Sequence, residues 1–289
     1  MNRRFLAPAK VNLTLRVVGR RADGYHLLES LMFFFPLYDI LEITPLPEGL
    51  ELHCEPAVTA LPEENLVLRA ARLLAQVAGV KRGARLRLVK HIPDGAGLGG
   101  GSSDAALTLL ALNRMWDVQL GRSELMALGL KLGADLPFFL GGEAALVGGV
   151  GERLTPLPTP LTGTCVVVFP GEGLATRRVF QALDGRFPCR PEPLGLPRAG
   201  EDLALWLEND LTLPALELMP GIGVAHAALL GVGARGAVMS GSGSTVVGLF
   251  ADSGQAEQAV ARLVADHPGW RIFAGALLNE HPFLSEANH

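Results

Sequence analysis

Apolar and polar residues alternate near the start of the chain with the period of a β-strand. From Val11 to Val18 the odd-numbered positions are apolar, whereas positions 12, 14 and 16 are polar, which predicts a strand with one buried face. Lys10 falls on the polar face beside Asn12. Further strands are predicted at residues 27–35, 38–44 and 50–54, with turn residues between them. The first sixty residues therefore predict an antiparallel sheet.

Helical periodicity appears in the middle of the chain. Asn65 can cap a helix whose apolar residues occupy positions 66, 70, 73, 74 and 77. Residues 84–92 alternate as another strand, which leads into a glycine-rich loop. Two further helices are predicted at 102–115 and 123–132, and residues 143–170 are rich in strand signals.

The last third of the chain mixes both periods. It predicts helices at 203–207, 224–230 and 255–266, and strands at 236–239, 245–250 and 270–274. This irregular order indicates an α+β fold rather than a regular βαβ repeat. Four prolines between residues 185 and 200 indicate a linker, so one possible domain boundary lies there.

Composition excludes several classes of protein. With 289 residues, 49% apolar and 19% charged, the chain can bury one or two cores, which excludes disordered and fibrous proteins. The net charge of -4 supplies no diffuse attraction to nucleic acid or to anionic membranes, so any phosphate site must be local. We therefore expect no nucleic-acid or membrane partner.

The cysteines and the N-terminus indicate a cytoplasmic protein. Cys54, Cys165 and Cys189 are far apart and lack metal-ligand spacing, which predicts reduced thiols and neither a disulfide framework nor a zinc site. The N-terminus lacks the apolar run of a signal peptide. Charged residues interrupt the most apolar stretch, 126–151, so no membrane span is predicted.

The glycine-rich loop between the strand at 84–92 and the helix at 102–115 is the main candidate for chemistry. Its candidate phosphate-binding residues are Pro93, Asp94, Gly95, Ala96, Gly97, Leu98, Gly99, Gly100, Gly101, Ser102 and Ser103. Five glycines within residues 95–101 let backbone N–H groups converge, and the following helix adds the positive end of its dipole. The alternative is a flexible turn with a serine cap, but strand-to-helix turns rarely contain this much glycine. We therefore favour a phosphate cradle.

Two other nucleotide-binding motifs fit this loop less well. Gly95, Gly97 and Gly100 satisfy the G-x-G-x-x-G pattern of a nicotinamide-dependent oxidoreductase. That fold requires an acidic residue about 20 positions on, at the end of the next strand, but helices fill this interval and leave Asp117 and Glu124 in the wrong setting. A Walker A loop would need a Gly-Lys-Ser/Thr sequence, which does not follow.

Four other candidates have ordinary structural explanations when taken singly. The glycine-serine cluster at 239–245 is typical of a hairpin turn. Asp135 lies between Gly133 and Pro137, in a sequence typical of a turn. Lys10 has the residue type of a surface charge, and the neighbouring residues Tyr25 and His26 could form a half-buried pair at a strand end.

Together, these segments match a known pattern in order and spacing, and the chain resembles the GHMP kinase superfamily, which includes galactokinase, homoserine kinase and mevalonate kinase. The segments are Pro8–Leu13, Arg21–Leu27 with Ser30–Met32, Gly95–Ala106, Gly133–Phe139, Glu208–Leu211 and Met239–Thr245. The resemblance implies two α+β domains, one like ribosomal protein S5 and one ferredoxin-like. Residues 1–155 would form the ATP-binding and catalytic domain, and residues 156–289 would complete the substrate cleft.

The resemblance also implies roles for particular residues. Asp135 would accept the proton of the substrate hydroxyl, Lys10 would keep that carboxylate ionised, and Asn12 would bind substrate beside them. ATP would lie on the glycine loop with Mg²⁺, for which Ser103 is a candidate contact but no metal ligand is assigned.

The segment around Tyr25 is the part of the resemblance that indicates a substrate. Tyr25 would stack on a cytosine, His26 would hydrogen-bond its edge, and Phe180 would supply a second ring on the other side. The implied reaction is phosphorylation of the 2-hydroxyl of a cytidine-diphosphate-linked methylerythritol in non-mevalonate isoprenoid biosynthesis. An oxidoreductase and an RNA-binding module remain as alternatives, although the acidic net charge opposes the latter.

Overall fold

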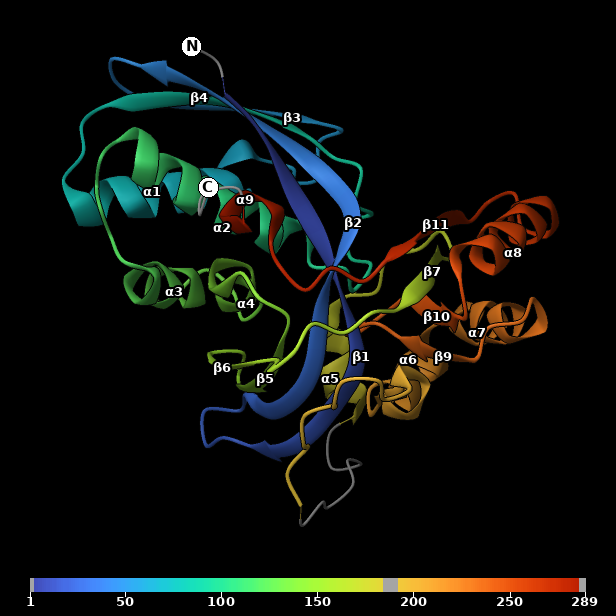
Figure 1. The fold of residues 1–289 in the computed structure, drawn as a ribbon. Coiled ribbons are helices and arrows are strands. Elements are labelled where there is room, and N and C mark those ends of the chain that lie inside the picture. The colour runs from blue at the N-terminus through green and yellow to red at the C-terminus, as the bar shows by residue number, and fades with distance from the viewer. Residues whose placement is uncertain (1–2, 184–191, 286–289) are drawn as a thin grey trace.

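Two β-sheets pack against each other and carry helices on their outer faces (Figure 1). The computed structural model describes residues 3–183 and 192–285. The strands are β1 (Arg3–Arg20), β2 (His26–Leu46), β3 (Leu50–Glu55), β4 (Gly83–Val89), β5 (Ala145–Gly149), β6 (Arg153–Pro156), β7 (Thr164–Phe169), β8 (Glu208–Asn209), β9 (Gly236–Met239), β10 (Val246–Phe250) and β11 (Arg271–Ala276). The helices are α1 (Leu66–Ala78), α2 (Gly100–Met115), α3 (Arg122–Leu130), α4 (Leu136–Gly141), α5 (Thr176–Leu183), α6 (Thr212–Leu218), α7 (Gly221–Gly231), α8 (Ser253–Asp266) and α9 (Pro282–Ser285), with short 3-10 helices at Pro62–Glu64 and Leu203–Trp206.

The larger sheet is built on the long antiparallel pair β1 and β2. Its order is β3-β4-β2-β1-β8, and β5 pairs with both β2 and β6. The separate strands expected at 27–35 and 38–44 are wrong, because β2 continues through Pro36. The register of the pair shifts after Pro8, so that Pro36 falls between the paired positions Phe35 and Tyr38. A bulge of this kind tolerates proline, which has no N–H to give to a partner strand.

The smaller sheet is antiparallel, with the order β11-β7-β10-β9. Strands β9, β10 and β11 and helix α8 confirm the elements predicted for residues 236–274, with ends that differ by at most two residues. Helices α4, α5 and α6 were not predicted. Pro137 lies in the first turn of α4, where a helix needs no N–H from it, so this proline begins a helix instead of only ending the preceding one.

The middle of β1 is buried on both faces. Val11 packs with Val167 and Val247 of the smaller sheet in a core between the two sheets. The opposite face carries Lys10 and Asn12, and each is only 3% exposed. The prediction of one buried face is therefore wrong, and Lys10 is not a surface charge, because glycine-rich loops cover the polar face of this strand.

The chain passes from the larger to the smaller sheet between β6, which ends at Pro156, and β7, which begins at Thr164. The division into residues 1–155 and 156–289 stays a proposal, and β8 later returns to pair with β1. Residues 184–191 lie outside the described residues. They include Cys189 and the first part of the proline-rich passage at 185–200.

The helices of the described residues were compared with the length and hydropathy of a membrane span. No single helix there is both long and apolar enough to cross a bilayer. Helices α6 and α7 meet the length and composition requirement only as a pair, and the chain bends by 118° between them.

His281 anchors the C-terminal segment to the core of the larger sheet. Its ring is fully buried and packs edge-on to Phe34, with ring centroids 5.4 Å apart. Nδ1 accepts a hydrogen bond of 3.2 Å from the backbone N–H of Phe283. Burial lowers the pKa of His281 to about 4, so the folded protein holds this ring neutral.

We expect acid to destabilise the fold through His281. The unfolded chain protonates this ring below its ordinary pKa of 6.5, whereas the folded chain resists protonation until about pH 4. The contribution of His281 to the free energy of unfolding should be complete above pH 7 and fall by about 1 to 2 kcal/mol by pH 5. Urea denaturation of wild type and His281→Gln at pH 7.5 and 5.0 measures this difference. An equal loss of stability in both proteins would contradict the prediction.

Candidate functional site

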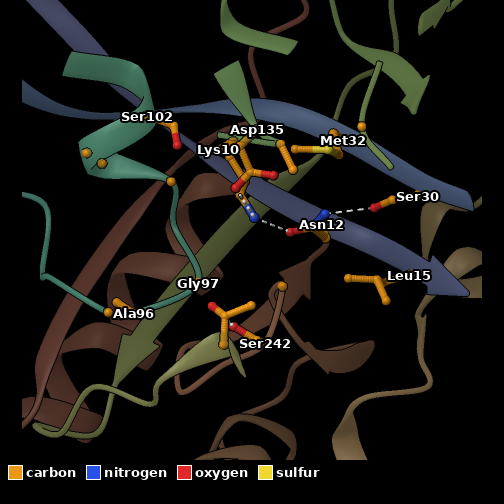
Figure 2. A pocket seen from close by; sticks show the side chains of 18 of the residues that line it. Lys10, Asn12, Leu15, Ser30, Met32, Ala96, Gly97, Ser102, Asp135 and Ser242 are labelled. Atoms are coloured by element: carbon orange, nitrogen blue, oxygen red, sulfur yellow. Dashed lines mark hydrogen bonds and ion pairs between the residues drawn. The ribbon is translucent and has the colours of Figure 1, made fainter. Parts of the chain in front are cut away.

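A cavity of about 390 Å³ lies on the polar face of β1. Lys10 and Asn12 line it from β1, the glycine loop lines it between β4 and α2, and Asp135 and Ser242 line it from two further loops (Figure 2). Residues that the sequence singled out separately thus face one cavity.

Lys10 lies at the centre of this cavity. Its Nζ donates a hydrogen bond of 2.6 Å to Oδ1 of Asn12 and lies 3.8 Å from Oδ2 of Asp135. Burial lowers the pKa of Lys10, and the Asp135 carboxylate opposes this effect. The Lys10 side chain is buried, whereas that of Asp135 is 43% exposed. A substrate can therefore approach the ion pair from the carboxylate side.

Hydrogen bonds fix the orientation of the Asn12 amide. Its Nδ2 donates to Oγ of Ser30 over 2.7 Å, and Ser30 in turn donates to the carbonyl of Thr14 over 2.6 Å. The amide oxygen therefore points towards Lys10, as Figure 2 shows. This chain of bonds holds the ammonium group of Lys10 in one place.

The glycine loop has the backbone of an anion cradle. Gly95, Gly97 and Gly99 have φ angles of 61°, 76° and 70°, a conformation that favours glycine and turns successive N–H groups to one side. Helix α2 begins at Gly100, two residues earlier than predicted. The N–H groups of its first turn have no partner inside the helix, and residues 100–102 line the cavity. The loop and the helix start together offer unpaired donors to a phosphate.

Leu98 and Ser103 differ from the other candidate residues of this loop because neither lines the cavity. Leu98 packs in the core between the sheets. Ser103 is fully buried, and its N–H donates to the carbonyl of Gly99 over 2.9 Å. Ser102 is the serine of this pair that faces the cavity.

The setting of the loop does not match a dinucleotide-binding fold. Strand β4 pairs antiparallel with β2 and parallel with β3. Helix α1 joins β3 to β4, so the glycine loop follows the last strand of that unit, whereas a dinucleotide-binding loop follows the first. The next strand along the chain, β5, pairs antiparallel with β2 and β6. No parallel βαβ unit therefore begins at β4, where such oxidoreductases require one.

The second glycine cluster is both a hairpin loop and part of the site. It joins the antiparallel strands β9 and β10, and its Gly241 and Ser242 line the cavity. The Oγ atoms of Ser242 and Thr176 lie 2.8 Å apart in a hydrogen bond. The hairpin interpretation is thus confirmed for the backbone, but it did not predict that the loop tip lines the cavity.

Gly97 is where the two glycine loops touch. A Cβ atom at this position would lie 2.2 Å from the carbonyl oxygen of Ser240, so no other residue fits without moving the backbone. The Oγ of Ser240 donates to the carbonyl of Gly97 over 3.1 Å and accepts from the N–H of Asn12 over 3.1 Å. Ser240 therefore connects the cradle to the strand that carries Lys10.

Sequence reasoning missed Lys90, a second buried ammonium group that lines the cavity. It forms ion pairs with Asp39 and, over 2.6 Å, with Asp104. Burial alone would lower the pKa of Lys90, but these two carboxylates raise it above its usual value. Its Nζ would lie 3.2 Å from a Cβ at Gly100. Asp39 and Asp104 compensate the charge of Lys90, so this cluster anchors the start of α2 without adding net positive charge. The position of Lys90, three residues before Pro93, was the only available signal.

Tyr25, His26 and Phe180 line a second cavity of about 660 Å³. The rings of His26 and Phe180 stack with centroids 5.0 Å apart and planes at 26°, whereas Tyr25 is 64% exposed. The two cavities share Ala134, Thr176 and Phe180 in their linings. The two cavities are therefore adjacent.

Metal-ligating residues do not cluster in the part of the chain that the structure describes. No group of three or more His, Cys, Asp or Glu side chains suited to a metal ion occurs there. A magnesium ion bound mainly through nucleotide phosphates and water needs only one or two protein oxygens. Ser102 supplies such an oxygen in the cavity lining, so the residues fit a nucleotide-bound ion.

Comparisons with known proteins match this geometry. The model of the GHMP kinases N terminal domain matches residues 65–143, and that of the GHMP kinases C terminal domain matches residues 196–268. The chain is 45% identical over 279 residues to the 4-diphosphocytidyl-2-C-methyl-D-erythritol kinase of Paramagnetospirillum magneticum, with 94% of this chain and 98% of the relative covered. It is 46% identical to the kinase of the same name from Paracoccus denitrificans, with 96% and 97% covered.

The fold agrees with these matches. A crystal structure of 4-(cytidine 5'-diphospho)-2C-methyl-D-erythritol kinase superposes with a TM-score of 0.78 at 42% identity, covering 96% of this chain and all of that one. The chain therefore belongs to the GHMP kinase family, and along nearly its whole length it is similar to the 4-diphosphocytidyl-2-C-methyl-D-erythritol kinases.

Proposed function

We propose that this kinase transfers the γ-phosphoryl group of ATP to the 2-hydroxyl of 4-diphosphocytidyl-2-C-methyl-D-erythritol, in non-mevalonate isoprenoid biosynthesis. The names of its relatives support this substrate. The observation that carries the proposal is the ion pair of Lys10 and Asp135, which opens into the same cavity as the glycine cradle.

The glycine cradle would hold the triphosphate of ATP. Backbone N–H groups of residues 95–102 and the dipole of α2 attract the phosphates without using lysine side chains. Lys90, paired with Asp39 and Asp104, would hold the start of α2 in place beneath the phosphates. Ser102 would contact a magnesium ion bound to the phosphates, and that ion would neutralise part of their charge.

Asp135 would accept the proton of the acceptor hydroxyl, and Lys10 would stabilise the developing negative charge on the attacking oxygen. The open side of Asp135 admits the hydroxyl, while the hydrogen bond to Asn12 keeps the ammonium group beside it. Since phosphoryl transfer depends mainly on positioning and on charge neutralisation, this pair supplies what the acceptor side requires.

The second cavity would bind the cytosine. Residues shared by the two linings connect this cavity to the one that contains Asp135. Two adjacent cavities suit an elongated substrate that has a diphosphate between its base and its sugar alcohol. The exposed ring of Tyr25 offers a stacking surface, and His26, which lines the same cavity, would hydrogen-bond the base edge. The rings of His26 and Phe180 are too close for a base to enter between them. The base would therefore stack on Tyr25. Phe180 would either contact the opposite face of the base or hold the ring of His26 in place.

The proposed substrates are small soluble molecules, and we propose that the reaction takes place in the cytoplasm without a nucleic-acid or membrane partner. The net charge of -4 supports this. So do Cys54 and Cys165, which are free thiols in the described part of the chain.

We expect Asp135→Asn to abolish turnover while ATP binding is retained, because Asp135 is assigned to the acceptor and not to the triphosphate. Loss of a positioned base should lower kcat on the order of 100-fold or more. A coupled ADP-release assay measures turnover, and calorimetry measures the Kd of ATP. Asp117→Asn, which removes a carboxylate outside both cavities, serves as control. Turnover near that of wild type in folded Asp135→Asn would contradict the assignment.

A second prediction concerns the base. Tyr25→Ala should weaken binding of the cytidine substrate by about 1 to 3 kcal/mol, the contribution of one base stack, whereas Tyr25→Phe keeps the ring and should bind normally. His26→Ala should reduce discrimination against a uridine analogue more than it reduces affinity. Michaelis constants for both pyrimidine substrates and for ATP measure these effects. If the variants mainly change the KM for ATP, the assignment of this cavity to cytosine fails.

A further inference from the structure

The segment Glu208–Leu211 has no role in the chemistry described above, yet it is tied to the strand that carries Lys10. Strand β8 pairs with β1 in parallel, with Asn209 opposite Leu15. The N–H of Asp210 donates to the carbonyl of Leu15 over 3.0 Å, and Oδ2 of Asp210 accepts from the N–H of Val17 over 2.8 Å. The backbone around Asn209 therefore moves with β1.

The side chain of Asn209 reaches from this segment to the second glycine loop. Nδ2 donates to the carbonyl of Met239 over 2.6 Å and to that of Gly241 over 2.8 Å. Oδ1 accepts from the N–H of Leu211 over 2.8 Å. Both N–H donors and the oxygen of the amide are thus used, and aspartate, which has no donor, could not replace it.

One of these carbonyl groups, that of Gly241, belongs to the second glycine loop, which packs closely against Lys10 and the first glycine loop. Gly241 has a φ of 58°, and a Cβ there would lie 3.1 Å from both Nζ of Lys10 and the carbonyl oxygen of Gly97. The next residue, Ser242, lines the cavity. A small shift of this loop would therefore press on the catalytic lysine or on the phosphate cradle.

We propose that Asn209 is a positioning residue for phosphoryl transfer, which sets the second glycine loop in register with Lys10 and with the first glycine loop. Asn209 does not line either cavity, so it acts through Gly241 and not by touching substrate. Reactions that depend on positioning lose rate when reacting groups shift by about 1 Å. The proposal rests on the proposed kinase function for its assay.

The test compares Asn209→Asp and Asn209→Ser with a matched control. Asn279 also uses Nδ2 and Oδ1 to hold a distant loop, at Leu161, over 2.8 and 2.9 Å, and it lies outside both cavities. Asn279→Asp and Asn279→Ser make the same chemical changes away from the site. The measurements are Tm, kcat, and the KM values for ATP and for the cytidine substrate.

We expect the Asn209 variants to lower kcat about 10- to 100-fold, with Asp more severe than Ser, and to change both KM values less than threefold. The Asn279 variants should lower Tm and leave kcat per folded molecule unchanged. A fall in Tm without a change in kcat at Asn209, equal effects at both positions, or failure of both Asn209 variants to fold would overturn the proposal. Lack of wild-type turnover with the cytidine substrate would instead refute the proposed function; the same comparison would then use the acceptor that wild type does phosphorylate.

Discussion

The open edge of β1 is the constraint from which the active site follows. Along the residues that carry Lys10 and Asn12, β8 does not extend far enough to pair with this strand. The N–H of Lys10 donates instead to the carbonyl of Leu98 over 2.9 Å, and that of Asn12 donates to Oγ of Ser240. A buried N–H without a partner costs about 1 to 3 kcal/mol, so both glycine loops must approach the strand. Their approach closes the cavity around Lys10.

Two buried ammonium groups in one cavity have different surroundings. Lys90 is paired with two carboxylates, and Asp39 of this cluster also accepts from the N–H of Ile92 over 2.8 Å. The two carboxylates compensate the ammonium charge, so this cluster fixes the start of α2 and adds no net positive charge beneath the cradle. Lys10 has one neutral partner, Asn12, and a single carboxylate at 3.8 Å. The charge of Lys10 is therefore less compensated than that of Lys90, which suits Lys10 to its proposed role in stabilising charge on a substrate oxygen.

Local sequence patterns predicted the parts of the site that depend on local backbone chemistry. The glycine loop, the helix after it and the strands of the smaller sheet follow from glycine conformation and from periodicity. The burial of Lys10 does not, because the residues that cover it, Gly241 among them, come from the far end of the chain. The same holds for Lys90 and Asn209, whose partners lie in other segments. Strand β2 continues through Pro36 because its pairing with β1 has a bulge there. The sequence of one strand does not show how it pairs with another, so this continuity was not predictable.

The roles proposed for Lys10, Asp135, Tyr25 and His26 all depend on one acceptor, so the most direct measurement is acceptor specificity. The purified protein is given ATP, magnesium and 4-diphosphocytidyl-2-C-methyl-D-erythritol, mevalonate, homoserine or galactose in turn, and ADP release and the phosphorylated product are followed. Adjacent cavities for a base and for a reacting hydroxyl predict phosphorylation of the cytidine compound at its 2-hydroxyl, with kcat/KM far above that of the other acceptors. A higher kcat/KM for an acceptor without a nucleobase would contradict this assignment.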